Sequence, residues 1–522
     1  MKVKLRPGTH LAPVNGGVYF ARGDRSFVLQ GPRALYEAVD DQLGNLTAGT
    51  DLDTLVRSTG GEAGRPVWQH VLTTLVGRDI LLDLDRVSPQ PEEADRVRFR
   101  DVLSWLESQV PDPYATFARL RGATVAVAGA AGPARDSLVR GLDQLGVGRV
   151  LAATDAAEPD LVVQLDGAPA TAGRPAIQLR TADGYALVTA APAAVADALA
   201  SRVDRWQQSD EDRASAAPLP MSAVLAGSLA AHGALRQLVG GLAGGQEATI
   251  VHGHTLQTDV VELAAPAEEQ PAAEPDGVPD LQARLGASAL TARWTGIVRL
   301  GRDLDVPQLP LALVTATLVE GAPEAPVLGF GLNRGAAAVN AMLAALRRLP
   351  AGTDEVAAAG LTPTRWLLDG ALRRHGAELL ARAPGHELTR DGLGAPSSVC
   401  TVWGLLEEYF QLPIRLVGRT AADTGWQLVS AEHRATGAVL ASQWGQTAAG
   451  AAQLALFTTV ACAQLGELLA TQPTEPVGTA ILETARGERL RELADVLVPA
   501  GRPAADPLLR PAGFCWGPVT AR

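Results

Sequence analysis

The segment 264–280, AAPAEEQPAAEPDGVPD, constrains the fold of this chain more than any other stretch. It is rich in proline, alanine and acidic residues, so it lacks the large apolar side chains that a packed core needs. We expect a linker here, with separate folding units on either side. The 522 residues of the chain are enough for two to four domains with sizeable cores.

Composition and charge exclude several classes of protein. The chain is 47% hydrophobic and 20% charged, and its net charge of −12 argues against a nucleic-acid binder. Its three cysteines, Cys400, Cys462 and Cys515, form no CxxC pair, so we expect no metal site and a reducing compartment. The N-terminus has no apolar signal core, and no run of about 18 apolar residues is found. We therefore predict a cytoplasmic protein without membrane segments.

The pattern of residues 1–85 predicts a small winged-helix domain. Two β-rich runs, VYFARG (18–23) and SFVLQG (26–31), are joined by a short turn around Asp24 and Arg25 and predict a hairpin. Three short helical segments and a closing strand follow.

Residues 86–121 predict a linker with a bridging helix, and residues 122–263 predict an α/β domain. The second stretch opens with a strand, a helix and another strand, which is the pattern of a parallel βαβ unit. The turn after its first strand contains only Gly129 and Gly132, so the fingerprint G-x-G-x-x-G is not met. We favour a structural Rossmann-type scaffold over a nucleotide site.

His252 and His254 flank Gly253 in a predicted strand. An i, i+2 pair in a strand points to one face and could bind a metal ion. No carboxylate or cysteine with suitable ligand spacing lies nearby, so we favour two ordinary strand histidines.

Residues 281–522 predict a third α/β domain. Strands are expected in TGIVRLGRD and LALVTATLV, a helix at 335–349, and a long Ala-rich helix at 448–470. The fold class of the whole chain is therefore α/β (α+β).

The N-terminal unit resembles the PqqD-like leader-recognition domain of ribosomal-peptide modifying systems. The matching stretches are LRPGTHLAPVNGGVYF, SFVLQGPRALYEAVD and the third helix. The resemblance implies that a leader peptide adds as a strand to the open hairpin edge and packs on the third helix. The implied peptide-binding residues are Ser26, Phe27, Val28, Leu29 and Gln30 at the edge, with Trp68, Val71, Leu72 and Leu75 as the wall. The alternative is that this helix stripe is only the core of a winged-helix module.

The middle and C-terminal units resemble two further families. Residues 125–155 are similar to the opening of ThiF-like activating enzymes, without their zinc motifs. GFGLNRGAAAVNAMLAALRRL (329–349) resembles the YcaO helix that carries ATP-binding glutamates. Ala344 and Arg347 fill the two acid positions, and Thr459 and Cys462 stand in the matching second helix. Mg²⁺ needs carboxylate oxygens against ATP phosphates, so we expect these ATP and Mg²⁺ positions to be lost and no cofactor to be bound.

Taken together, the three units resemble the ocin-ThiF-like, or F-type, leader-binding partner proteins of azoline-forming (thiazole/oxazole, thiopeptide) cyclodehydratases. The resemblance implies a non-catalytic protein that binds a precursor peptide leader and that can form a homodimer. It would deliver core Cys, Ser or Thr residues to a separate catalytic YcaO cyclodehydratase. Two alternatives stay open. In the first, the chain is itself a fused ATP-dependent cyclodehydratase. In the second, it is a scaffold that binds no peptide.

Overall fold

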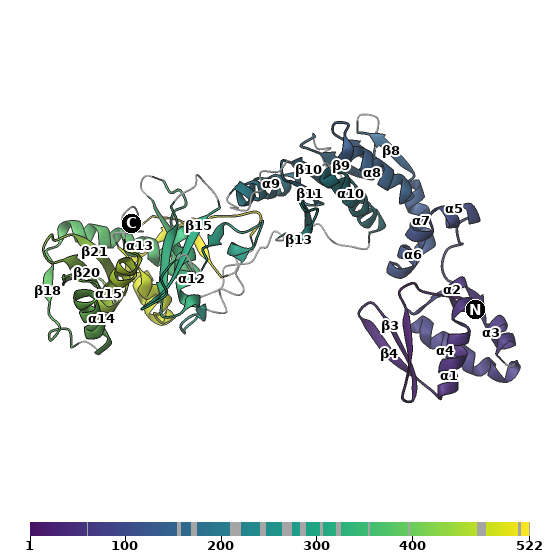
Figure 1. Ribbon diagram of the computed structural model, residues 1–522, viewed down its shortest axis with the longest axis horizontal. Coiled ribbons are helices and arrows are strands. Elements are labelled where there is room, and N and C mark those ends of the chain that lie inside the picture. The colour runs from purple at the N-terminus through teal and green to yellow at the C-terminus, as the bar shows by residue number, and fades with distance from the viewer. Residues whose placement is uncertain are drawn as a thin grey trace. The chain divides into compact units, whose positions relative to one another are not determined.

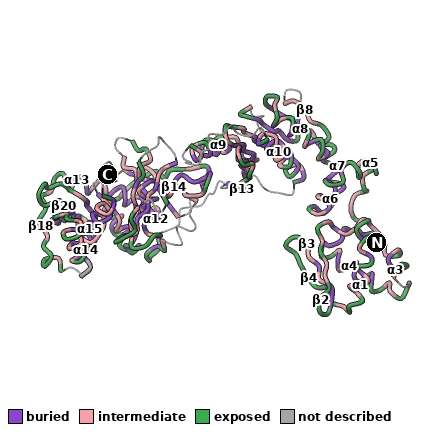
Figure 2. The backbone as a smooth tube through the Cα atoms, in the orientation of Figure 1, coloured by how far each residue is buried: buried purple, intermediate pink, exposed green. Residues whose placement is uncertain are grey.

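The protein, seen in a computed structural model, has two compact units (Figure 1). The N-terminal unit contains Met1–Ala196 and Ser215–Glu262, and the C-terminal unit contains Asp197–Ala214 and Leu263–Arg522. The structure describes residues 1–59, 61–153, 158–168, 175–208, 221–240, 247–263, 274–281, 289–302, 306–319, 325–352, 355–394, 397–466, 477–509 and 513–520. Buried backbone runs through the interior of each unit (Figure 2). The predicted α/β class is confirmed.

The described part of the first domain of the N-terminal unit has two small antiparallel sheets and four α-helices, and the strand β6 is its last element. Its strands are β1 (Lys2–Leu5), β2 (His10–Val14), β3 (Gly17–Arg22), β4 (Arg25–Gln30), β5 (Thr50–Asp51) and β6 (Leu81–Asp83). The sheet orders are β5-β1-β6 and β2-β3-β4. The helices are α1 (Arg33–Asp41), α2 (Leu43–Ala48), α3 (Leu52–Ser58) and α4 (Arg65–Gly77).

Local sequence explains these elements. The β3–β4 turn consists of Gly23 and Asp24, with Gly23 at a φ of 60°, which suits a two-residue hairpin loop. Arg25 belongs to the strand and not to the turn. Asp51 caps α3 by accepting a hydrogen bond of 2.8 Å from the backbone N–H of Thr54.

Three helices follow where a linker with one bridging helix was predicted, and the end of the second contacts the first domain. They are α5 (Glu93–Arg98), α6 (Arg100–Gln109) and α7 (Pro113–Gly122). The buried carboxylate of Glu107 on α6 accepts from Lys4 Nζ at 2.7 Å and from the Tyr114 hydroxyl at 2.8 Å. Arg6 donates to the carbonyl oxygens of Glu107 and Val110. This contact area is therefore polar and specific, not a loose tether.

The remainder of the N-terminal unit is built on a seven-stranded sheet of order β13-β12-β11-β10-β9-β7-β8. The strands β10, β9, β7 and β8 are parallel, as the βαβ pattern predicted, and the other three are antiparallel. The strands are β7 (Thr124–Ala128), β8 (Arg149–Ala152), β9 (Leu161–Leu165), β10 (Ala176–Ala182), β11 (Tyr185–Thr189), β12 (Glu247–His252) and β13 (Thr258–Glu262).

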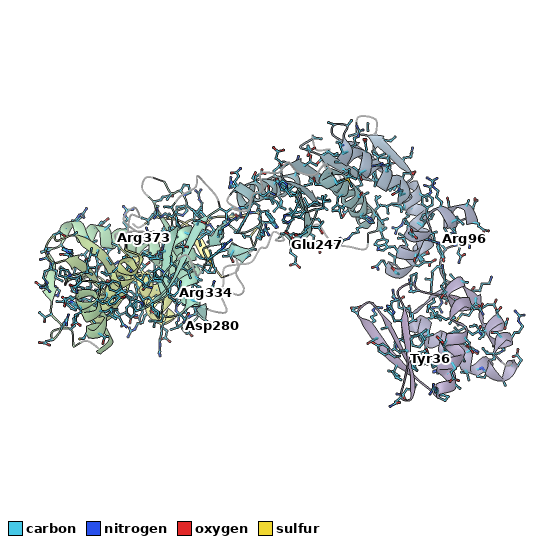
Figure 3. All side chains as sticks on the ribbon, viewed as in Figure 1. Tyr36, Arg96, Glu247, Asp280, Arg334 and Arg373 are labelled. Atoms are coloured by element: carbon cyan, nitrogen blue, oxygen red, sulfur yellow. The ribbon has the colours of Figure 1, made fainter. Side chains whose placement is uncertain are left out.

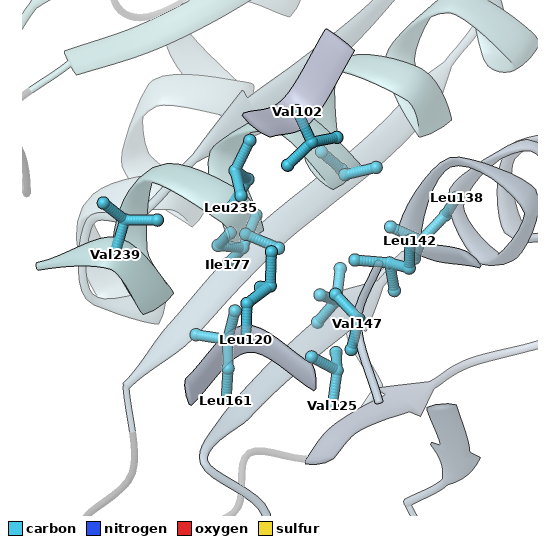
Figure 4. Close-up of a cluster of buried hydrophobic side chains, with 14 of the residues drawn as sticks. Val102, Leu120, Val125, Leu138, Leu142, Val147, Leu161, Ile177, Leu235 and Val239 are labelled. Carbon is cyan, nitrogen blue, oxygen red and sulfur yellow. The ribbon is translucent and has the colours of Figure 1, made fainter. Parts of the chain in front are cut away.

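The helices α8 (Pro133–Gln144) and α10 (Met221–Val239) pack closely together in this domain. Gly227 makes the approach possible, because a Cβ atom there would lie 2.2 Å from the carbonyl oxygen of Ala134. Side chains from both helices, from α6 and α7 and from the sheet form one core (Figure 4).

The C-terminal unit contains three sheets, of order β14-β15-β16, β17-β23-β22 and β18-β19-β20-β21. The strands are β14 (Val298–Leu300), β15 (Ala312–Leu318), β16 (Val327–Gly331), β17 (Val356–Gly360), β18 (His386–Leu388), β19 (Ile414–Thr420), β20 (Gln427–His433), β21 (Val439–Gly445), β22 (Ala500–Gly501) and β23 (Cys515–Thr520). Among the residues that the structure describes, its α-helices are α12 (Arg334–Leu346), α13 (Pro363–Arg382), α14 (Ser397–Glu408), α15 (Ala448–Leu465) and α16 (Gly487–Leu497). The helix α9 (Ala193–Gln208) joins this unit through an ion pair of 2.7 Å between Arg202 and Asp506.

The predicted linker 264–280 ends earlier than its composition suggested. Glu274 is buried, and its carboxylate forms an ion pair of 2.8 Å with the buried Arg365. Asp276 pairs with Arg491. The segment that begins at Glu274 therefore belongs to the C-terminal fold, because Glu274 and Asp276 both form ion pairs with arginines of that unit.

One helix among the described residues, α15, is long and apolar enough by length and composition to cross a membrane. No such stretch was expected from the sequence. Half of it is buried inside the C-terminal unit, and the core helix of a globular protein meets the same two criteria. The cytoplasmic location stays a prediction.

Candidate functional sites: an open strand edge and a cavity

The strand β4 is an open edge, as the leader-binding hypothesis requires. In the sheet β2-β3-β4 it pairs with β3 and with no other described strand. Ser26, Val28 and Gln30 are exposed, Phe27 is half-buried and Leu29 is buried. An unpaired edge of this kind offers backbone donors and acceptors to an incoming strand.

The pattern of hydrogen bonds between β3 and β4 shows which residues of β4 have free backbone groups at the open edge. The N–H of Gly31 donates to the carbonyl oxygen of Gly16 at 2.9 Å, so this opposite pair is hydrogen-bonded. Hydrogen-bonded and non-hydrogen-bonded pairs alternate along an antiparallel ladder. The backbone groups of Ser26, Val28 and Gln30 therefore point away from β3 to the open edge.

The turn end of the hairpin is held in place by charge. Asp79, directly after α4, forms ion pairs with Arg6 at 3.0 Å, with Arg25 at 3.5 Å and with Arg22. Arg22 also donates to the carbonyl oxygen of Ser108 on α6 at 2.6 Å. The edge strand is thus fixed before any ligand arrives, which lowers the entropic cost of strand addition.

The predicted groove wall on α4 is corrected by the structure. Trp68, Val71, Leu72 and Leu75 are 4% exposed or less and lie in the domain's own core. A peptide cannot reach them in this structure. Beside β4, the α4 end instead presents Arg78, whose guanidinium carbon lies 5.4 Å from the centre of the Phe27 ring.

The middle domain offers no metal or phosphate constellation among its described residues. Gly129 has a φ of 124°, and a Cβ atom there would lie 2.7 Å from Leu165 Cβ, so close packing explains this glycine. The strand β12 ends at His252, whose Nε2 lies 3.0 Å from Asp259, whereas His254 lies in the following turn. The two histidines do not share a strand face, and no described group of three possible ligands could hold a metal ion.

The C-terminal unit contains a cavity of about 150 Å³. It lies between the edge strands β16 and β21, with α12 and α15 also contributing to the lining. Figure 3 labels Arg334, the first residue of α12. Ala344, Arg347 and Cys462 line the cavity, so the sequence reasoning brought the right helices together.

Arg347, which stands where the YcaO helix carries a glutamate, is paired with a buried residue. It donates to both carboxylate oxygens of Asp369 on α13, at 2.9 and 2.8 Å, and to the Thr479 hydroxyl at 3.2 Å. Asp369 is fully buried and also accepts from the backbone N–H of Ala359 at 3.0 Å. Both carboxylate oxygens of Asp369 therefore accept from Arg347 in a bidentate, charge-assisted pair.

On α15, Thr459 lies outside the cavity lining. Thr459 is 1% exposed, donates to the Ala455 carbonyl oxygen at 2.8 Å and does not line the cavity. Its neighbour Thr458 does line the cavity and accepts from Gln443. Burial raises the pKa of the Cys462 thiol to about 11, so this thiol stays protonated near neutral pH.

Sequence reasoning missed Glu483, which ends a short 3₁₀ turn (Ala480–Glu483) on the cavity wall. It is 4% exposed, and its Oε2 atom has no hydrogen-bond partner in the described part of the chain. Burial raises the pKa of this carboxyl to about 7. Nothing in the surrounding letters ILETARGER distinguishes this acid from a surface one, so no sequence signal pointed to it.

Comparisons with known proteins agree with the whole-chain architecture. Comparisons with protein-family models and with curated proteins found no match. A solved structure described as a heterocyclase in complex with substrate and cofactor matches 100% of this chain and 94% of its own, with 12% identity and a TM-score of 0.58. The structure of the heterocyclase TruD matches 99% of this chain and 94% of its own, with 14% identity and a TM-score of 0.53. This chain shares its overall fold with these two structures. The similarity concerns the fold alone, and it extends from end to end.

Proposed function

We propose that this protein binds the leader of a ribosomally made precursor peptide at the β4 edge and delivers the core peptide to a separate YcaO cyclodehydratase. The observation that carries the proposal is an open, anchored edge strand within a chain that has the heterocyclase fold over its full length. One such heterocyclase was solved with a substrate and a cofactor. Strand addition supplies affinity through backbone hydrogen bonds and specificity through alternate side chains.

The cavity favours a partner protein over a fused enzyme. Arginine and alanine stand where carboxylates would hold Mg²⁺, and the arginine is committed to Asp369. A volume of about 150 Å³ is also below the roughly 300–1,000 Å³ of sites for drug-sized ligands. Both features support a chain that does not use ATP itself.

The contribution of such a partner is proximity. A leader held on the N-terminal unit raises the effective concentration of core Cys, Ser or Thr side chains at the catalytic partner. The YcaO partner would supply the ATP chemistry that closes the azoline ring. The C-terminal unit, with its heterocyclase fold but altered cavity, is the proposed docking surface for that partner or for a second copy.

The proposal is tested by fluorescence polarisation with the full chain and a labelled cognate leader. We expect a Kd in the micromolar range or tighter, about −8 kcal/mol. Azoline formation, followed by mass spectrometry, should require both this chain and the YcaO partner. Binding without any stimulation of the partner would contradict delivery. Azoline formation by this chain alone with ATP would establish the fused-enzyme alternative, and the absence of leader binding would favour a scaffold.

A further inference from the structure

The cavity of the C-terminal unit holds two polar groups whose binding capacity the fold does not use. Arg348 lines the cavity, and its guanidinium has no ion pair or hydrogen bond within the described residues. Glu483 lines it as well, nine-tenths buried and with an unpartnered Oε2. Buried polar atoms normally have partners, so an unpartnered carboxyl and a guanidinium without an ion pair in the walls of one cavity point to a ligand that contacts both.

The other charges near the cavity are already balanced. Arg347 is neutralised by Asp369 through two hydrogen bonds. Arg365 is neutralised by Glu274 at 2.8 Å. A ligand therefore meets one uncompensated positive charge, at Arg348, which suits a single carboxylate better than a doubly charged phosphate.

The rest of the wall sets the size and polarity of the ligand. Apolar side chains line the cavity from β16, α12, β21 and α15; they are Val327, Leu328, Phe330, Ala344, Leu440 and Ala461. Polar side chains line it as well; they are Asn340, Ser442, Gln443, Thr458 and Thr479. The volume of about 150 Å³ equals that of a cavity that accepts one benzene ring. A single ring therefore fills a space of this size.

We propose that this cavity binds a small ring-bearing carboxylate, with Arg348 holding the carboxylate and Glu483 donating a second hydrogen bond from its protonated form. The inference does not rest on leader binding, which belongs to the other unit. It assigns the cavity a ligand class of its own in place of ATP.

The protonation of Glu483 gives the site a defined pH dependence. Burial raises its pKa to about 7; Arg365 and Arg347 lower it, and Asp369 and Glu274 raise it. Above pH 7 the carboxyl loses the proton it would donate and repels the ligand carboxylate. If only the protonated form binds, affinity falls about tenfold between pH 6 and pH 8.

The probe for the test is 4-fluorobenzoate, followed by ¹⁹F NMR on the full chain at pH 6. We expect line broadening that saturates in the millimolar range or below, and that unlabelled benzoate reverses. Benzamide, which has the ring without the charge, and inorganic phosphate, which has charge without the ring, should not compete at matched ionic strength.

Two variants and one control locate the binding. Arg348→Gln should weaken binding tenfold or more, because a hydrogen-bonded charge is lost. Glu483→Gln keeps a donor and should bind equally at pH 6 and pH 8. The control Arg489→Gln, at a surface pair on α16, should change nothing.

Several outcomes would overturn the assignment. They are no broadening at pH 6, equal competition by phosphate, or unchanged affinity in Arg348→Gln. If Arg348→Gln does not fold, the benzamide and phosphate competitions on the unaltered chain still decide the question. Leader polarisation measured on Arg348→Gln should be unchanged, so a failure of this inference is distinct from a failure of leader binding.

Discussion

Replacing Val28 by proline tests strand addition at a single backbone atom. The N–H of Val28 points to the open edge of β4, so its loss spares the pairing with β3. Proline is tolerated on edge strands for this reason. The Val28 side chain is 43% exposed, so little core packing is lost. We expect the domain to keep its fold.

The effect on leader binding follows from one missing hydrogen bond. A peptide carbonyl left without its partner at this position costs about 1–3 kcal/mol, which weakens the Kd roughly 5- to 150-fold. Fluorescence polarisation with labelled leader measures the change, and urea unfolding checks stability. The matched control is Val28→Thr, which keeps the N–H and the β-branched shape. Equal leader affinity in folded Val28→Pro and Val28→Thr would refute strand addition at β4.

Three further results are expected. Leu72→Ala should destabilise the first domain by about 2–5 kcal/mol in urea unfolding, because this side chain is fully buried. The control Val67→Ala, on the exposed face of the same helix, should change the free energy of unfolding by less than about 0.5 kcal/mol. The pKa of Glu483 is about 7 in the folded chain and 4.5 in an ordinary glutamate, so the folded state is more stable when this carboxyl is protonated. This stabilisation is present below pH 4.5 and is lost as the pH rises through 7; the change of about 3 kcal/mol should be absent in Glu483→Gln. The purified chain should show no peptide-stimulated ATPase activity in a phosphate-release assay, and clear activity would favour the fused enzyme.

The sequence predicted elements better than it predicted which way their side chains face. The hairpin of β3 and β4 followed from its β-rich runs, and α12 followed from its Gly-flanked apolar pattern. The apolar residues at helical spacing on α4, such as Leu72, could be assigned to either of two faces, because a core face and a groove wall have the same periodicity. Thr458 lines the cavity and Thr459 does not, because one residue along a helix turns the side chain by about 100°, and sequence spacing alone does not give that rotation.

Long-range pairings were beyond the reach of the sequence for a different reason. The strand β17 pairs with β23, far along the chain, and no local pattern encodes that partnership. Glu274 looked like linker charge, because its buried partner Arg365 lies on a distant helix. Glu483 looked like surface charge, because only the assembled cavity shows that its carboxyl is buried.

The pairing of Arg347 explains why placing an acid at this position should fail. Its guanidinium neutralises Asp369, which is fully buried. Arg347→Glu would remove that partner and bring a second carboxylate beside the first, and loss of one member of a buried pair costs about 3–5 kcal/mol.

The adjacent Arg348→Glu is the matched control, because Arg348 has no described partner and its reversal strands no buried charge. Urea unfolding should therefore separate the two variants by several kcal/mol, and neither should gain ATPase activity. Equal stability of the two variants would show that Asp369 does not depend on Arg347. The acid position would then be open to Mg²⁺ ligands, and the case against a fused enzyme would lose its structural basis. If the difference is found, the arginine is held in place by the fold itself, and recovery of an ATP site would require changing Asp369 at the same time.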